Sequence, residues 1–149
     1  MTRLGQLFQN QVLLATLLAW LVAQTLKVGV YVWRRKHFDF RWFLGTGGMP
    51  SAHSSGVTAL ATGVGLNVGF HTPAFAVATM FAMVTMFDAQ GVRRAAGRQA
   101  VLLNKMVDDM YMKGQVSEKR LVELLGHTPV EVFVGSAVGC AIAVLVYRW

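Results

Sequence analysis

LFQNQVLLATLLAWLVAQTLKVGVYVW, residues 7–33, is the almost wholly apolar stretch that decides the fold. As one helix it is long enough to cross a hydrocarbon core about 30 Å thick. A cleavable signal peptide fits it poorly, because the run has no obvious small-residue cleavage site and contains Lys27. We therefore interpret it as the first of several transmembrane helices.

The composition of the whole chain is also that of a membrane protein. Of its 149 residues 54% are hydrophobic and only 14% are charged, which is too apolar for an ordinary soluble domain of this length. The net charge of +7 does not indicate nucleic acid, because no basic stripe interleaved with aromatic residues occurs. The basic residues lie beside the apolar segments, so membrane lipids with anionic headgroups are the expected partners.

Further apolar segments follow, and they predict one all-α, polytopic membrane domain over residues 1–149 with about four transmembrane helices. The charged stretch 88–127 is expected to be extramembrane or interfacial and partly helical, with a short amphipathic helix around 117–125. The second, third and fourth apolar helices are predicted over residues 50–70, 73–87 and 129–147.

The basic residues predict an orientation in the membrane. They gather in the connections after the first and third apolar helices, whereas the connection 66–73 carries none. By the positive-inside rule, both termini face away from the cytoplasm, and both basic connections and all candidate site residues lie on the cytoplasmic side. The expected location is a bacterial inner membrane or an organellar or thylakoid membrane.

Lys27 is the first candidate site residue, because an ammonium group within a membrane helix is costly unless it faces a partner or a wet cavity. Arg34 follows seven residues later, so the two cations share one side of a helix about two turns apart. Alternatively, Lys27 snorkels to the interface and Arg34 is only a topology signal.

In the segment GGMPSAH, residues 47–53, two flexible glycines come shortly before the expected start of a helix. Backbone N–H groups and the helix dipole favour a phosphate there, with the Ser51 hydroxyl as a further donor. His53, on the first turn, can be protonated near neutral pH and can give a proton to a leaving alkoxide. Alternatively, Ser51 is only a helix cap and His53 an interfacial residue.

The segment DAQGVRRAAGR, residues 88–98, places two adjacent arginines just beyond the third apolar helix. The planar guanidinium group suits phosphate oxygens. The sequence does not decide whether Arg93 or Arg94 faces the site, and Asp88 can orient either by pairing. The alternative is a solvated or lipid-facing basic surface.

The segment GHTPVE, residues 126–131, starts the last apolar helix. If that helix reaches back far enough, the Glu131 carboxylate accepts from one nitrogen of His127, fixes the tautomer and leaves the other nitrogen free as a nucleophile. Thr128 to Glu131 is also a capping box with Pro129 at the first helical position, which explains Glu131 without catalysis, and both interpretations can hold together. The four histidines have no metal-ligand spacing, so no metal and no other cofactor is predicted.

In this order the motifs resemble the type 2 phosphatidic acid phosphatase superfamily, whose signature is Lys-x6-Arg-Pro, then Pro-Ser-Gly-His, then Ser-Arg-x5-His-x3-Asp. The departures of the chain from this signature include the following: Arg35 replaces the proline, Ala52 replaces the glycine, Glu131 replaces the aspartate, and Leu121 stands where the arginine of the third motif is expected. With these departures it resembles the divergent, YuiD-like branch of acid phosphatase/vanadium-dependent haloperoxidase-related membrane proteins.

The resemblance implies metal-independent hydrolysis of a lipid phosphate or diphosphate. His127 would attack phosphorus and form a phosphohistidine, and His53 would protonate the leaving oxygen. The groups that would hold the phosphate oxygens are Lys27, Arg34, Ser51, Arg93 or Arg94, and the backbone around Gly48.

The altered third motif motivates an alternative function. According to this alternative, the chain is a catalytically silent membrane protein that binds phosphate or lipid headgroups and supports assembly of a larger complex. Gly65-x3-Gly69 and Gly135-x3-Gly139 permit close helix contacts within or between chains, so a homo-oligomer is also left open.

Overall fold

The computed structural model describes residues 3–43, 47–111 and 126–148, and every regular element in this part of the chain is a helix. This confirms the predicted all-α fold, whereas the amphipathic helix expected around 117–125 lies outside the described residues. The elements are α1 (Arg3–Phe8), α2 (Gln11–Arg35), the 3-10 helix η1 (Phe40–Phe43), α3 (Ala52–Val68), α4 (Pro73–Gln90), α5 (Val92–Tyr111) and α6 (Pro129–Tyr147).

Three helical stretches are long and apolar enough to cross a membrane: Gln11–Arg35, Pro73–Asp108 and Pro129–Tyr147. The second of them joins α4 to α5. The expected second span, α3, has 17 residues and a length of about 25 Å. It is not among the three, so the predicted count of four is not confirmed.

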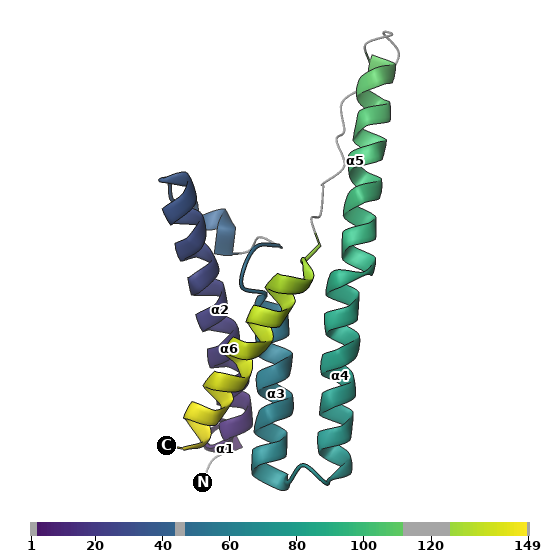
Figure 1. Cartoon of the computed structure of the whole chain (residues 1–149). Coiled ribbons are helices and arrows are strands. Elements are labelled where there is room, and N and C mark those ends of the chain that lie inside the picture. The colour runs from purple at the N-terminus through teal and green to yellow at the C-terminus, as the bar shows by residue number, and fades with distance from the viewer. Residues whose placement is uncertain (1–2, 44–46, 112–125, 149) are drawn as a thin grey trace.

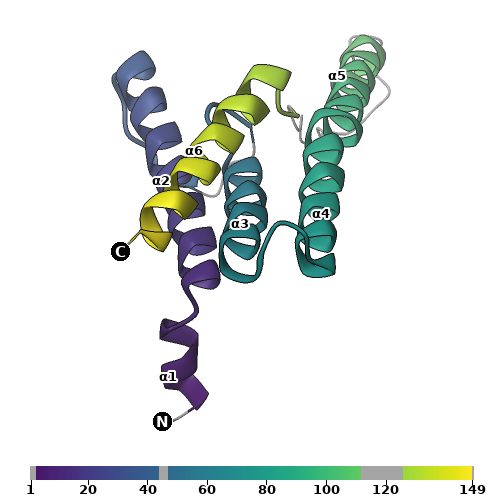
Figure 2. The same ribbon diagram turned by 60° about the horizontal axis from the view of Figure 1, so that its bottom comes forward.

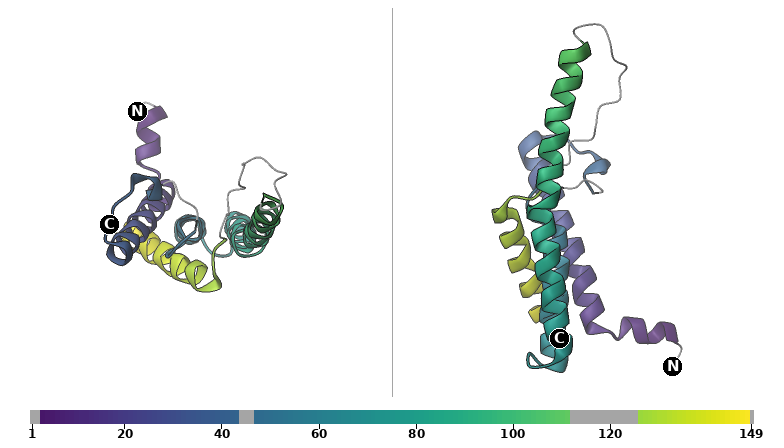
Figure 3. Two further views of the ribbon diagram at one scale, coloured as in Figure 1. Left: turned by 90° about the horizontal axis from the view of Figure 1, so that it is seen from above. Right: turned by 90° about the vertical axis from the view of Figure 1, so that its right-hand side faces the viewer.

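The short helix α3 occupies the centre of the bundle. It runs beside α2 and α4, and α6 crosses it on one face (Figure 1). Turned by 60°, the bundle shows α1 projecting away from the other helices (Figure 2). The view from above places α3 between α2 and α4, and the side view shows α4 and α5 as one long rod that extends beyond the bundle (Figure 3).

Polar caps set where the helices begin. The side chain of Asn10 accepts a hydrogen bond from the Leu13 N–H, at 3.0 Å, so α2 starts at Gln11 rather than further upstream. Thr72 and Thr128 cap α4 and α6 in the same way, and each is followed by a proline at the first helical position. These two helices therefore start where the sequence predicted.

Small residues let the helices approach closely. Ala15 and Ala19 of α2, Ala59 of α3 and Ala143 of α6 form one buried cluster. The large apolar side chains point outward instead, as expected for helices that face lipid. Exposed examples on three helices are Leu17, Leu21, Val77, Phe81 and Leu145.

The glycine pair of α6 serves contacts within the chain. A Cβ atom added to Gly135 would clash with the backbone of Ser51, and one added to Gly139 would clash with the backbone of Ser55. Both contacts are with α3 or its cap. The structure therefore uses Gly135-x3-Gly139 for intramolecular packing.

Candidate active site

A cavity of about 240 Å³ lies where α2, the loop before α3 and the start of α6 meet. This end of the bundle lies opposite the two chain termini (Figure 1). The residues that line the cavity are Lys27, Val30, Tyr31, Arg34, Gly48, Met49, Thr128, Val130 and Glu131. The cavity thus contains both predicted cations of α2.

Lys27 is the more deeply placed of the two cations. Its exposed fraction is only 3%, which does not fit a side chain that snorkels to the surface. The carboxylate of Glu131 exerts an electrostatic attraction on it, and a buried ammonium needs such compensation. Arg34 lines the same cavity but is exposed.

Glu131 takes part in both arrangements that the sequence allowed, the contact with His127 and the capping box. Its Oε2 accepts a hydrogen bond from the Thr128 N–H, at 3.0 Å, and lies 3.1 Å from Nδ1 of His127. The Thr128 hydroxyl accepts in return from the Glu131 N–H, at 3.4 Å, which completes the capping box. An ionised carboxylate can only accept, so in the neutral imidazole Nδ1 is the donor and Nε2 carries the lone pair.

His127 is held from its backbone as well as from its side chain. Its N–H donates to the carbonyl of Ala89 in the last turn of α4, at 3.1 Å. With an exposed fraction of 4%, His127 is buried between α4 and α6. It is not among the residues that line the cavity, and it is connected to them through Glu131.

Ser51 ties the start of α3 to the start of α6. Its N–H donates to the carbonyl of Glu131, at 3.0 Å, and its hydroxyl accepts from the N–H and the hydroxyl of Ser54. The capping role of Ser51 is therefore present in the structure, with the side chain fully buried. Because two helix N-termini meet here, their partial positive charges reinforce each other.

Gly48 lies where another residue would not fit. Its φ angle of +85° is one that side chains rarely adopt, and a Cβ atom there would collide with the ring of Tyr31. The glycine therefore allows the loop before α3 to close against α2 at the cavity wall.

Tyr31 is a cavity residue that the sequence analysis missed. Its position near the end of the first apolar run is typical of an interfacial aromatic belt. It also lies four residues after Lys27 and three before Arg34, so the same helical spacing that relates the two cations places it on their side. That spacing is the signal that could have found it.

His53 and Asp88 are not among the described residues that line the cavity. His53 lies on the first turn of α3, as predicted, but its side chain is exposed and does not line the cavity. Asp88 is half-buried near the end of α4. Arg93 and Arg94 lie in the first turn of α5, and their side chains are outside the described part of the structure.

The charged side chains that line the cavity are two cations and one carboxylate. Among the described residues, no three His, Cys, Asp or Glu side chains form a group that could hold a metal ion. The cavity offers the ammonium group of Lys27 and the guanidinium group of Arg34, and the imidazole of His127 lies behind the lining residue Glu131. Such an arrangement can bind an oxyanion and place a nitrogen nucleophile near it.

Comparisons with known proteins identify the family of the chain. A family model described as "Divergent PAP2 family" matches residues 8–142. The uncharacterized membrane protein YuiD of Bacillus subtilis (strain 168) is 45% identical to the chain over 145 residues, which cover 90% of this chain and 92% of YuiD. No solved structure matches the chain.

Proposed function

The chain belongs to the divergent PAP2 family, and on that premise we propose that it is a membrane phosphatase that hydrolyses a lipid phosphate or diphosphate. The observation that supports this most is the pairing of His127 with Glu131 beside a cavity that contains Lys27 and Arg34. An oriented imidazole and a cationic oxyanion pocket are the parts that metal-independent phosphoryl transfer needs.

In the proposed reaction His127 is the nucleophile. The lone pair of Nε2 forms a bond to phosphorus as the bond from phosphorus to the lipid oxygen breaks. The electron pair of the broken bond stays on that oxygen, which takes a proton from the protonated imidazole of His53. Glu131 stabilises the charge that develops on the His127 ring by accepting from Nδ1.

Water completes the cycle. His53, now neutral, takes a proton from a water molecule whose oxygen attacks the phosphohistidine. The N–P bond breaks, its electron pair returns to Nε2 and inorganic phosphate leaves. Lys27, Arg34, the Gly48 backbone and the N-terminus of α3 at Ser51 stabilise the negative charge on the phosphate oxygens, together with Arg93 or Arg94.

The test is phosphate release by the full chain purified in detergent. Phosphatidate, phosphatidylglycerol phosphate and an isoprenyl diphosphate are the substrates to compare. The variant His127→Ala is expected to lose activity by about 10³-fold or more, as removal of a nucleophile does. Hydrolysis that survives this substitution would exclude the mechanism.

His71→Ala is the matched control. His71 is exposed and lies in the connection between α3 and α4, at the other end of the bundle from the cavity. This variant is expected to release phosphate at the rate of the unmodified protein. A loss equal to that of His127→Ala would indicate a general effect of histidine removal.

A second candidate function is supported by the positions of the two histidines. His53 is exposed, and His127 lies behind Glu131 rather than in the cavity wall. A protein that only binds phosphate or lipid headgroups, and supports assembly of a complex, needs the cations but neither histidine.

Vanadate binding separates the two candidates. In both, vanadate binds and Lys27→Met weakens its binding, because the buried ammonium is removed from the cavity. In the phosphatase His127→Ala abolishes turnover, whereas the binding protein shows no turnover with any of the three substrates. A structure with vanadate bound would also show whether Nε2 of His127 lies on the line of attack.

A further inference from the structure

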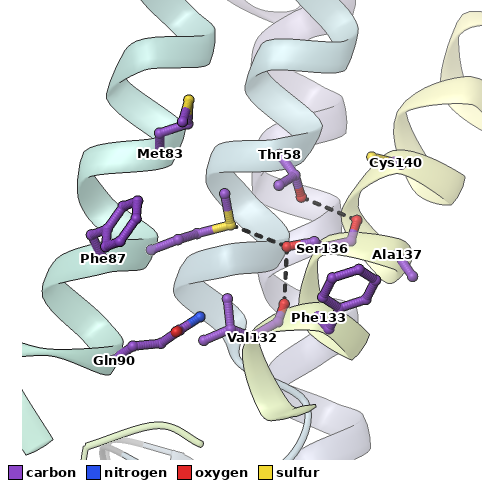
Figure 4. Close-up of a pocket in the computed structure, with 10 residues that line it drawn as sticks. Thr58, Met83, Phe87, Gln90, Val132, Phe133, Ser136, Ala137 and Cys140 are labelled. Carbon is purple, nitrogen blue, oxygen red and sulfur yellow. Dashed lines mark hydrogen bonds between the residues drawn. The ribbon is translucent and has the colours of Figure 1, made fainter. Parts of the chain in front are cut away.

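A larger cavity, of about 460 Å³, lies between α3, α4 and α6 and shares no lining residue with the polar cavity. Among the described residues that line it, none is Lys, Arg or His. The hydroxyl of Ser136 already lies 2.9 Å from the carbonyl of Val132 and 3.2 Å from the sulfur of Met86 (Figure 4). An oxyanion therefore finds its partners in the polar cavity and not in the larger one.

The polar cavity offers a phosphate group little net charge. Lys27 and Arg34 are its lining cations, and the carboxylate of Glu131 opposes them. A phosphate monoester carries between one and two negative charges near neutral pH, because its second pKa is about 6. Neutral hydrogen-bond donors in the cavity wall can supply the remaining stabilisation of the phosphate oxygens.

Tyr31 brings a neutral donor into this wall. Its half-buried side chain lines the cavity. It follows Lys27 by four residues and precedes Arg34 by three, so the three side chains lie on one side of α2. A phenol hydroxyl can donate a hydrogen bond to an anionic oxygen. The other lining hydroxyl, that of Thr128, caps α6.

The hydroxyl end of Tyr31 lies beside the backbone of Gly48. A Cβ atom built on Gly48 would lie 2.6 Å from Oη of Tyr31, and 3.0 Å from Cε2 and from Cζ. The nearest atom of the ring system is thus the hydroxyl oxygen. In the proposed reaction the Gly48 backbone stabilises the phosphate oxygens, so the hydroxyl is placed beside a group that serves the same oxyanion.

A role as a membrane-interface anchor would leave the ring exposed. Trp33, two residues further along α2, has an exposed fraction of 79%, as an aromatic side chain of an interfacial belt does. Tyr31 is half-buried in the cavity wall instead. The two aromatic side chains near the end of α2 therefore serve different surfaces.

We propose that Tyr31 is a further phosphate-binding residue of this site, and that its hydroxyl donates a hydrogen bond to an oxygen of the phosphate group. The inference rests on the proposed function, which places that phosphate in the polar cavity. Lys27, Tyr31 and Arg34 then form one face of α2 that supplies two charges and one neutral donor. Packing of the ring against Gly48 holds the hydroxyl at the cavity wall.

Tyr31→Phe tests the hydroxyl alone, because it keeps the ring that packs against Gly48. The probe is orthovanadate, a tetrahedral oxyanion like phosphate, and its binding to the full chain in detergent is measured by equilibrium dialysis. The dissociation constant is expected to rise by about tenfold or more, which is typical of losing a hydrogen bond to a charged group. The value of kcat/KM for phosphatidate should fall by a similar factor, and thermal unfolding without vanadate should not change.

Tyr147→Phe is the matched control. Tyr147 is the last residue of α6, has an exposed fraction of 41% and lies at the end of the bundle opposite the polar cavity (Figure 1). Removal of its hydroxyl is expected to leave vanadate binding and phosphate release unchanged. A loss equal to that of Tyr31→Phe would show that the effect does not belong to the cavity, and would overturn the inference.

The outcomes distinguish this inference from the proposed function. Vanadate binding that Tyr31→Phe does not weaken, or an unmodified chain that binds no vanadate, would overturn the role of the hydroxyl even if phosphate release persists. Weaker binding together with a lower unfolding temperature would assign Tyr31 a structural role and overturn it as well. Weaker binding at unchanged stability, in a chain that hydrolyses none of the three substrates, would support the hydroxyl as a phosphate ligand and contradict the phosphatase.

Discussion

At the scale of single residues, Glu131 is the point where the fold and the proposed chemistry meet. Its side chain accepts hydrogen bonds from the Thr128 N–H and from Nδ1 of His127, and its backbone carbonyl accepts from the Ser51 N–H. It also attracts the buried ammonium group of Lys27 electrostatically. One residue thus caps α6, orients the imidazole, fixes the start of α3 and attracts a buried cation.

Glu131→Gln separates these roles. The amide oxygen of glutamine can still accept from one N–H group, so the helix cap is largely kept. The negative charge that holds Nδ1 of His127 as a donor is lost, and we expect phosphate release to fall by about 10²- to 10⁴-fold. The free energy of unfolding should fall by only about 1–3 kcal/mol. Full activity in this variant would contradict the assigned role.

Thr72→Ala is the control for the stability part of that effect. Thr72 caps α4 as Thr128 caps α6, with a proline at the first helical position in both cases, but it lies away from the site. This variant is expected to lose about 0.5–2 kcal/mol of stability and to keep its activity per folded molecule. Thermal unfolding in detergent, measured beside phosphate release, checks both variants.

Spacing along one helix decided which site residues could be predicted. Lys27 and Arg34 lie on one side of α2 because an α-helix repeats every 3.6 residues. His127 precedes α6, so its contact with Glu131 is made across the capped start of that helix and not along a helix face. The approach of Gly48 to Tyr31, or of Ser51 to Glu131, joins segments that are distant in sequence. No local pattern fixes such a distance, because it depends on how the helices pack.

At the scale of the helices, α6 packs closely against the backbone of α3 at two of its glycines. The backbone of Ser51 lies against Gly135, and that of Ser55 lies against Gly139. Thr58 adds a hydrogen bond to the carbonyl of Ser136, at 3.2 Å. In lipid, where apolar burial between helices contributes little, such close approach is a main source of stability.

Gly139→Ala is expected to lower the free energy of unfolding by about 1–3 kcal/mol, because the added methyl group must displace backbone of α3. Gly135→Ala should lower it similarly and should reduce phosphate release as well, since Ser51 is tied to Glu131. Thermal unfolding in detergent and the phosphate assay distinguish the two variants.

Gly29→Ala serves as the control for the glycine variants. A Cβ atom at Gly29, on the exposed side of α2, meets nothing within 4 Å. We expect no loss of stability there, since alanine favours a helix more than glycine does. A destabilisation as large as that of Gly139→Ala would contradict the packing argument.

The starts of the helices could be predicted from the sequence more reliably than the number of helices that span the membrane. Thr128 and Pro129 marked the start of α6 correctly because capping is a local interaction. The count of four spans included α3, which has 17 residues and is not among the three helical stretches that are long and apolar enough to cross a membrane. Its central position between the other helices, which hydropathy does not report, explains how so short a helix is buried.

At the scale of the whole molecule, charge is distributed unevenly between the two ends. Arg34, Arg35 and Lys36 lie at the cavity end, and α5, with Arg98 and Lys105 exposed, extends beyond the bundle on that same side (Figure 1). The connection between α3 and α4, at the opposite end, carries no Lys or Arg. The positive-inside rule therefore predicts that the cavity faces the cytoplasm.

Cysteine labelling in intact bacterial cells checks this orientation. In a Cys140→Ala background, which removes the single native thiol, His37→Cys reports on the cavity end and Asn67→Cys on the opposite end, both positions being exposed. A membrane-impermeant maleimide should label Asn67→Cys in intact cells and His37→Cys only after permeabilisation. The reverse pattern would place the cavity outside. In the proposed phosphatase this orientation would take a lipid substrate from the cytoplasmic leaflet, because a lipid of that leaflet presents its phosphate group at the end of the bundle where Lys27 and Arg34 lie.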